Sequence, residues 1–325
     1  MSTFPKKTLL ASVGMAALMA IAPAHAYVMA SSVINMTGFE ILNSGGTILS
    51  AAGANTATPT GDFATLTFTS SADQSAALTG FATLNNSGNV APINFAPICL
   101  GAGCAGFTTD NAFPHPTAPP ASGNYSAADQ NEAGSPVSNL SGFTPPATVA
   151  DAAYAGLDTG SADASSTSNN NLNSSFTFVL TQSGGITLDF NVDAYLQVAM
   201  TSAELFPGVA TASYSVQFSI TNLDDTNPLT RTVFTWNPDI FGQGLTTLSL
   251  NAPLLTPDQN LFVNEVAGAF SNTTPTLNAG THYQLSARIT TLADATRQVP
   301  EPGALSLLGI ALMGLAGTGF WRRRA

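Results

Sequence analysis

Between its two ends, the chain alternates apolar and polar residues over short stretches, which is the period of a β-strand with one buried face. Residues 63–69 are typical, because Thr65, Thr67 and Thr69 alternate with apolar side chains. Similar stretches predict strands at 39–42, 47–50, 176–181, 186–193, 212–220, 231–236, 245–250 and 282–290. No helical period of useful length lies between them. The pattern predicts an all-β fold, an antiparallel β-sandwich.

Turn residues separate these strands. Residues 43–46 (Asn-Ser-Gly-Gly) contain glycines that accept the positive φ of a tight turn, which predicts a hairpin joining 39–42 to 47–50. Ser183, Gly184 and Gly185 predict a second hairpin joining 176–181 to 186–193. Asn- and Asp-rich segments at 222–228 and 237–239 supply further turns.

The middle of the chain breaks this pattern. Nine of the twenty prolines fall within 91–146, and residues 161–175 form a low-complexity polar stretch. We therefore predict a long Pro/Gly-rich, irregular insertion or linker over 91–175. It is either an insertion in one sandwich or a separator of two units, 27–90 and 176–298.

The N-terminus has the order of an export signal. Lys6 and Lys7 precede an apolar stretch at 8–22, and small residues follow at the positions that a signal peptidase accepts. We predict a signal helix over 1–26, with 27–298 as the exported part. The predicted cleavage site comprises Ala24, Ala26 and Tyr27.

The C-terminus has the order of a membrane anchor. Residues 304–321 carry no charge and as a helix would span about 27 Å, close to the hydrocarbon thickness of a bilayer. We predict a transmembrane helix there. The arginines that follow it should stay cytoplasmic by the positive-inside rule. Pro300 and Pro302 stop the helix from extending outward.

The sequence Pro300-Glu301-Pro302, the apolar span and the terminal cluster Arg322, Arg323 and Arg324 together resemble the PEP-CTERM sorting signal, here over 299–325. The resemblance implies a Gram-negative bacterium that makes exopolysaccharide. It also implies processing by an exosortase, a membrane transpeptidase that recognises Pro-Glu-Pro, with the arginines as a retention cluster. The chain would cross the inner membrane, be anchored there transiently, and end at the cell surface or in the extracellular matrix.

The same signal is sometimes labelled an ice-binding protein C-terminal domain. Ice binding needs a flat, regular array of Thr or similar side chains. No repeat extends the alternating threonines of 63–69, so the sequence disfavours ice binding.

Charge is scarce in this chain. Charged residues make up 8% of it, against about 25% in an ordinary soluble protein. The exported part carries eighteen acidic and three basic residues, a net charge of about −15. Nucleic acid is thereby excluded as an expected partner, because phosphate binding requires Lys and Arg. Such a surface either serves solubility alone or contacts divalent cations or a hydrated polysaccharide.

Cys99 and Cys104 are separated by four residues and are the two cysteines of the chain. In an exported protein this spacing predicts a disulfide that closes a small loop. Zinc is not expected, because four ligands are needed and no paired histidines lie nearby.

Two acidic groups are weak calcium candidates. Asp189, Asn191 and Asp193 have the spacing that begins an EF-hand loop, but the glycine and glutamate that such a loop needs are missing. In a strand, the same spacing places all three on a solvated face. Asp224 and Asp225 lie in a turn and are more simply explained by an Asx-type turn. We predict no metal or other cofactor, with calcium as an alternative.

The exported part lacks recognised catalytic motifs. His115 and His282 are expected to be structural, although the sequence leaves open a pair of carboxylates such as a glycosidase uses. Among the aromatic residues, Tyr214 and Trp236 are predicted in the core, and Tyr125 and Tyr154 on an exposed surface.

The function predicted from these features is that of a non-enzymatic, exosortase-processed envelope or matrix protein. It would have a structural or adhesive role beside exopolysaccharide in a biofilm. A secreted polysaccharide hydrolase and a calcium-stabilised adhesin are the alternatives.

Overall fold

The structure is a computed structural model that describes residues 27–51, 62–68, 71–88, 93–116, 123–140, 142–158, 162–171, 176–200, 208–238, 247–251 and 260–297. The predicted signal helix (1–26) and transmembrane helix (304–321) lie outside these residues. Within them, the one helix is a short 3-10 turn, η1 (Ala102–Gly106). None of the described helical segments is long and apolar enough to cross a membrane.

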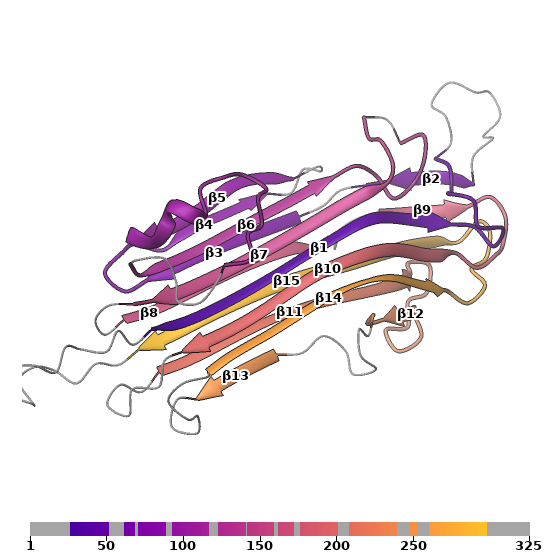
Figure 1. The fold of residues 1–325 in the computed structure, drawn as a ribbon. Helices are drawn as coiled ribbons and strands as arrows, with labels where there is room; N and C mark the ends of the chain where they lie inside the picture. The colour runs from indigo at the N-terminus through magenta and orange to yellow at the C-terminus, as the bar shows by residue number, and fades with distance from the viewer. Residues whose placement is uncertain are drawn as a thin grey trace, which may run out of the picture.

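The described chain is all-β and forms two antiparallel sheets that lie face to face (Figure 1). The first sheet has the order β14-β10-β1-β7-β6-β5. Its strands are β1 (Val28–Leu42), β5 (Asn94–Gly101), β6 (Tyr125–Ala133), β7 (Ala147–Leu157), β10 (Thr187–Met200) and β14 (Asn260–Thr273).

The second sheet has the order β12-β11-β15-β8-β3-β4, with β13 paired to β11, and β9 paired to β15 and β2. Its strands are β2 (Phe63–Thr67), β3 (Ser71–Leu78), β4 (Leu84–Gly88), β8 (Ala162–Asn171), β9 (Phe176–Leu180), β11 (Gly208–Asn222), β12 (Thr232–Trp236), β13 (Thr247–Asn251) and β15 (His282–Arg297).

The core lies between the two sheets and is built from alternate residues of each strand. At one end it contains aromatic rings from both sheets: Phe190 of β10 packs against Phe218 of β11, with ring centroids 5.4 Å apart. Trp236 stacks on the same Phe218. Tyr214 is also buried in this core. The prediction that Tyr214 is a core residue is therefore confirmed, whereas Trp236 is half-buried and packs against the core.

Segments 27–90 and 176–298 contribute to the same sheets. Strand β1 lies between β10 and β7 in the first sheet and hydrogen-bonds with both along most of its length. Strand β3 reaches β15 through β8 in the second sheet. The two parts of the chain are therefore interleaved by strand pairing.

The prediction of an irregular stretch over 91–175 was wrong for four segments, which form β5, β6, β7 and β8. The signal was hidden because β7 is buried on both faces, so its sequence does not alternate. Its core positions are also filled with alanine instead of large apolar residues. Five alanines of β7 have almost no exposed surface: Ala147, Ala150, Ala152, Ala153 and Ala155.

One predicted turn is confirmed and the other was wrong. After β1, the Asn43 N–H donates to the Thr47 carbonyl, and Leu42 forms a bridge with Ile48, as a tight turn requires. Strands β9 and β10, in contrast, belong to different sheets. The chain between them arches from one sheet to the other, and Gly184 exchanges two backbone hydrogen bonds with Leu277 instead of closing a hairpin.

The described chain starts and finishes at the same end of the sandwich. Gly208 pairs with Arg297, the last residue of β15, and its α-carbon lies against Val28, the first residue of β1. We call this the terminal end. The turns at 43–47, 181–186 and 223–231 lie at the other end, the loop end (Figure 1). Because the sixteen residues of β15 extend from the loop end to the terminal end, the two ends are roughly 50 Å apart.

Candidate functional site

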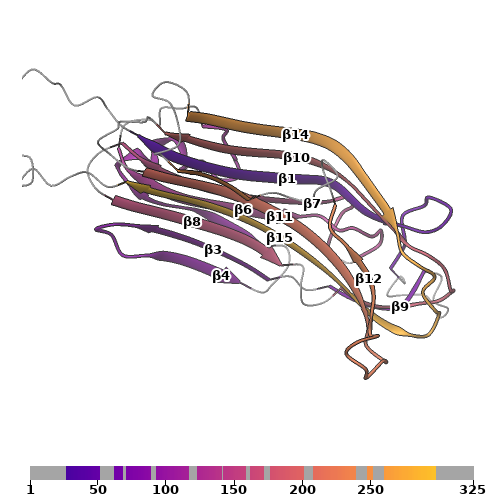
Figure 2. The same cartoon turned by 90° about the horizontal axis from the view of Figure 1, so that it is seen from below.

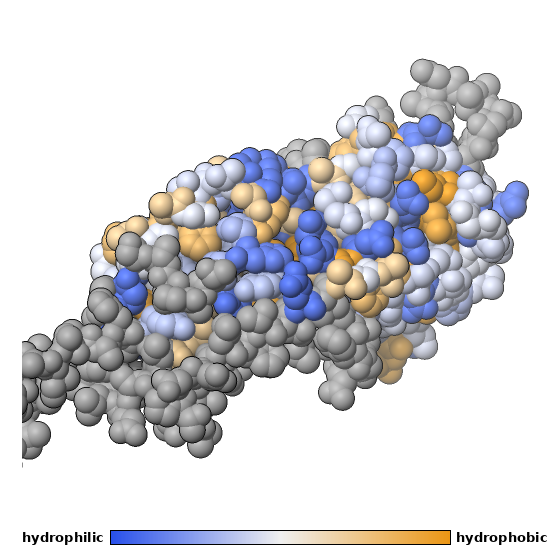
Figure 3. Space-filling model, viewed as in Figure 1, coloured by the Kyte–Doolittle hydropathy of each residue, from blue (hydrophilic) through white to orange (hydrophobic). Residues whose placement is uncertain are grey.

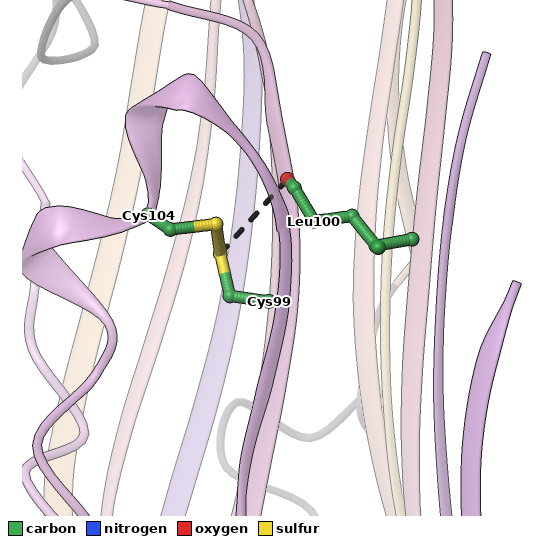
Figure 4. Close-up of a disulfide and its surroundings, with 3 residues drawn as sticks. All are labelled: Cys99, Leu100 and Cys104. Atoms are coloured by element: carbon green, nitrogen blue, oxygen red, sulfur yellow. Dashed lines mark hydrogen bonds between the residues drawn. A yellow bond between two sulfur atoms is a disulfide. The ribbon is translucent and has the colours of Figure 1, made fainter. Parts of the chain in front are cut away.

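Two places on this framework carry polar chemistry, and the first lies on the outer face of the first sheet. There a disulfide joins Cys99 and Cys104, with their Cα atoms 5.8 Å apart (Figure 4), which confirms the predicted pairing. Cys99 points away from the sandwich and Leu100 into it, as alternate residues of β5 must. The disulfide fixes the start of residues 102–116, which we call the strap.

The strap packs across the outer face of the sheet. Phe107 lies against the rings of Tyr125 and Tyr154, with centroid distances of 4.8 and 4.6 Å. Farther along, His115 stacks on Tyr195 at 4.3 Å. The prediction that Tyr125 and Tyr154 are exposed was wrong, because each is only 1% exposed. They belong to β6 and β7, and the strap removes them from solvent.

Asp129 is a buried carboxyl beneath the strap, and it was missed by sequence reasoning. It is 5% exposed, and its Oδ2 accepts a hydrogen bond of 3.0 Å from the Asn111 N–H. Burial raises its pKa to about 7, and the nearby negative charge of Asp110 acts in the same direction. Burial also raises the pKa of Tyr154, with a further contribution from Asp129. A raised pKa suits proton transfer, but the strap closes this carboxyl to a substrate.

The second place is a hollow at the loop end, with a volume of about 240 Å³. It is formed by the turn after β1, by Asp62 and by the arch between β9 and β10. Its lining consists of Asn43, Ser44, Gly45, Thr47, Leu49, Asp62, Leu180, Thr181, Gln182, Ser183, Gly184, Gly185 and Ile186.

Several lining groups of the hollow are held in place by hydrogen bonds. The Asn43 carboxamide oxygen accepts from the Gly45 and Thr47 N–H groups, and Asp62 accepts from the Ser50 N–H at 2.8 Å. Ser44 and Gln182 are exposed at the rim. The lining contains one carboxylate and no basic residue. Hydroxyl, amide and peptide groups of this kind can donate to and accept from an uncharged ligand rich in hydroxyl groups.

The surrounding surface is mainly hydrophilic. Figure 3 shows hydrophobic residues only in small, separate areas among polar ones on the face it presents. The most exposed large apolar side chain among the described residues is Leu229, in the turn between β11 and β12 at the loop end.

The calcium candidates lie in two separate places. Asn191 and Asp193 are exposed on the outer face of β10 and Asp189 is half-buried there, while Leu188, Phe190 and Val192 face the core. This is the solvated face that the spacing predicted. No group of three or more metal-ligating side chains is found among the described residues.

Asp225 forms the expected Asx-type turn, whereas Asp224 contacts the start of β15. Asp225 Oδ1 accepts from the Asn227 N–H, and Asp224 Oδ2 from the His282 N–H, each at 2.9 Å. The His282 imidazole also lies 3.0 Å from Asp224 Oδ1. The hydrogen bond from the His282 backbone lowers the pKa of Asp224. His282 thus links the start of β15 to the turn, in agreement with a structural role.

The comparisons with known proteins identify one part of the chain. Residues 298–324 match the family described as the PEP-CTERM protein-sorting motif, so the predicted sorting signal is confirmed. The chain is accordingly an exported protein addressed to an exosortase. Neither the curated proteins nor the solved structures contain a match to it. The motif begins directly after β15 and lies outside the described residues, as do Ala24 and Ala26 of the predicted cleavage site.

Proposed function

We propose that this protein is a non-enzymatic component of the cell surface or extracellular matrix that contacts exopolysaccharide through the hollow at its loop end. The observation that carries the proposal is the position of the hollow. It lies at the end of the sandwich opposite Arg297, the last described residue, and so would face away from the membrane when the chain is held by its C-terminus.

The orientation follows from the last strand. Arg297 ends β15 and is 7% exposed, and the sorting motif begins at the next residue. In the sequence, therefore, no long linker separates the folded part from the motif. The loop end then stands roughly 50 Å from that point, given the length of β15.

The ligand class follows from the lining of the hollow. Its single carboxylate, together with the net negative charge of the exported part, disfavours uronic acids and phosphorylated sugars, because like charges repel. Side-chain hydroxyls, amides and backbone groups favour the hydroxyl groups of a neutral polysaccharide. Because no aromatic ring lines the hollow, we expect each contact to be weak, with useful affinity arising from many copies on one polymer.

Binding of the exported chain to neutral and to acidic polysaccharides of the host tests this proposal. Replacing Ser44 and Gln182 by alanine should weaken retention on the neutral polymer several-fold. The matched control replaces Asn85 and Ser87, two exposed polar residues of β4, and should leave retention unchanged. Equal binding by both double variants would contradict the proposed site.

A polysaccharide hydrolase is the second candidate, because the pKa of Asp129 is raised to about 7; this activity would require the strap to open, since Asp129 lies beneath it and is hydrogen-bonded to Asn111. Release of oligosaccharides from the host polymer, lost in Asp129→Asn, would support the hydrolase and replace our proposal. Polymer that is bound but not shortened supports the non-enzymatic role.

A further inference from the structure

The two sheets have several edge strands, and three of these are short or interrupted. Strands β4 and β12 span five residues each. The pairing of β5 with β6 shifts register between Phe95 and Ile98, where Pro97 removes a hydrogen-bond donor. Short edges, bulges and prolines are the devices by which natural proteins prevent edge strands from pairing with other chains.

Strand β14 is also an edge strand and has none of these devices. It spans fourteen residues and pairs with β10 in one unbroken register from Asn260 to Thr273. Among the described strands β10 is its only hydrogen-bonding partner, and Figure 2 shows β14 along the outer edge of its sheet. One row of its backbone N–H and C=O groups therefore faces outward.

The side chains of β14 also allow close approach. Ala267, Gly268 and Ala269 are small and exposed. The strand contains no proline, lysine or arginine, and Glu265 is its one charged residue. A single charge in fourteen residues protects a strand poorly against pairing.

We propose that β14 is a self-association surface, on which β14 of a second copy of this chain adds in antiparallel orientation and extends the first sheet across both molecules. A second copy fits better than a free peptide, because its β14 is already extended and pays no ordering entropy on pairing. It also presents the same small side chains. A pairing centred on Ala269 places each Glu265 opposite Thr273 of the other copy, so the two carboxylates do not meet.

This surface is distinct from the hollow and does not depend on polysaccharide binding. The hollow lies at the loop end, whereas the exposed part of β14 runs along the side of the sandwich. Because β14 runs from the terminal end to the loop end, antiparallel pairing reverses one sandwich relative to the other, and the two hollows lie at opposite ends of the dimer. Because each copy carries a net charge of about −15 in its exported part, repulsion opposes pairing and salt should strengthen it.

The test is sedimentation of the full chain at low and at high sodium chloride. A mild detergent is present in such excess that micelles outnumber chains, so that two chains do not share a micelle by chance. We expect a dimer whose dissociation constant falls as salt rises. Ala269→Asp places like charges opposite each other and should raise that constant roughly three- to tenfold. The matched control is Asn191→Asp, which adds the same charge on β10 directly beside Ala269, one strand in from the edge. It should leave the constant nearly unchanged.

A second measurement does not depend on the stability of the charged variants. Both natural cysteines are in the disulfide, so Ala269→Cys adds the single free thiol. Mild oxidation should convert the full chain to a covalent dimer, whereas Asn191→Cys should not. A chain that stays monomeric at every salt concentration, or two aspartate variants that behave alike, would overturn the proposal.

Discussion

The ring of Tyr125 occupies the space that a side chain on Gly156 would fill. A Cβ placed on Gly156 would overlap the Cε1 and Cζ atoms of that ring, and Tyr125 is buried beneath Phe107 of the strap. The absence of a side chain on β7 therefore allows a tyrosine on β6 to pack flat on the sheet. The strap depends in turn on this ring.

Gly156→Ala should consequently destabilise the fold. Overfilling a packed site costs about 1–3 kcal/mol, because the ring or the backbone must move. Urea unfolding measures the loss of free energy. The control is Gly106→Ala in η1, where no atom lies within 4 Å of the added Cβ. A similar loss in both variants would contradict the packing explanation.

The raised pKa of Asp129 predicts that the stability of the protein depends on pH in the neutral range. Its pKa is about 7 in the folded protein against 3.8 for the free group, so the folded state binds the proton more tightly. The stabilising contribution of this proton is complete below about pH 4, falls as pH rises towards 7, and is absent above it.

Asp129→Asn keeps an oxygen that can accept from the Asn111 N–H and removes the titration. The variant should be more stable than the natural protein at pH 8, on the order of 2 kcal/mol, and equally stable at pH 4. Thermal unfolding across this range checks the difference. Asp193→Asn, at an exposed position, should not flatten the pH profile.

The disulfide should act locally. It closes a loop of a few residues, so replacing Cys99 and Cys104 by alanine should cost about 2 kcal/mol. We expect faster hydrogen exchange in the strap, because its start is no longer fixed, and unchanged exchange in β10 and β11. Equal acceleration throughout both sheets would show that the bond supports the whole fold instead.

Calcium at millimolar concentration should leave the melting temperature unchanged. Asn191 and Asp193 point into solvent from one strand face, and the oxygens of Asp224 already interact with His282. A rise in melting temperature that Asp193→Asn abolishes would restore the calcium-stabilised adhesin as the better interpretation.

Changing the sorting motif should change processing and leave the fold intact. Glu301→Ala removes the central residue of Pro300-Glu301-Pro302, so the unprocessed chain should accumulate in a host that contains an exosortase. The mass of the chain recovered from the envelope reports this. Glu265→Ala, a change of the same kind in β14, should be processed normally.

Local patterns in the sequence were sufficient to predict a strand and its buried face where the strand has one buried and one solvated face. The prediction for 186–193 gave the correct faces of β10, and the strands at 212–220 and 231–236 fall within or around β11 and β12. Cysteine spacing in an exported chain was sufficient for the disulfide. The sorting motif is recognised from its linear order alone.

Local sequence patterns failed to predict burial where a segment distant in the chain covers the strand. Strand β7 lost its alternation because the strap covers its outer face, and the same cover buries Tyr125, Tyr154 and Asp129. The glycines at 184 and 185 resembled a hairpin turn, yet the chain there passes between sheets, because β9 pairs with β2 and β15.

The sequence by itself determined the address of this protein and the all-β character of its exported part, since both depend on residues close together in the chain. Only the tertiary structure decided which strands pair, which carboxyl is buried and which edge stays open. Those features depend on contacts between residues far apart in the chain, and a local period of hydrophobicity carries no information about them.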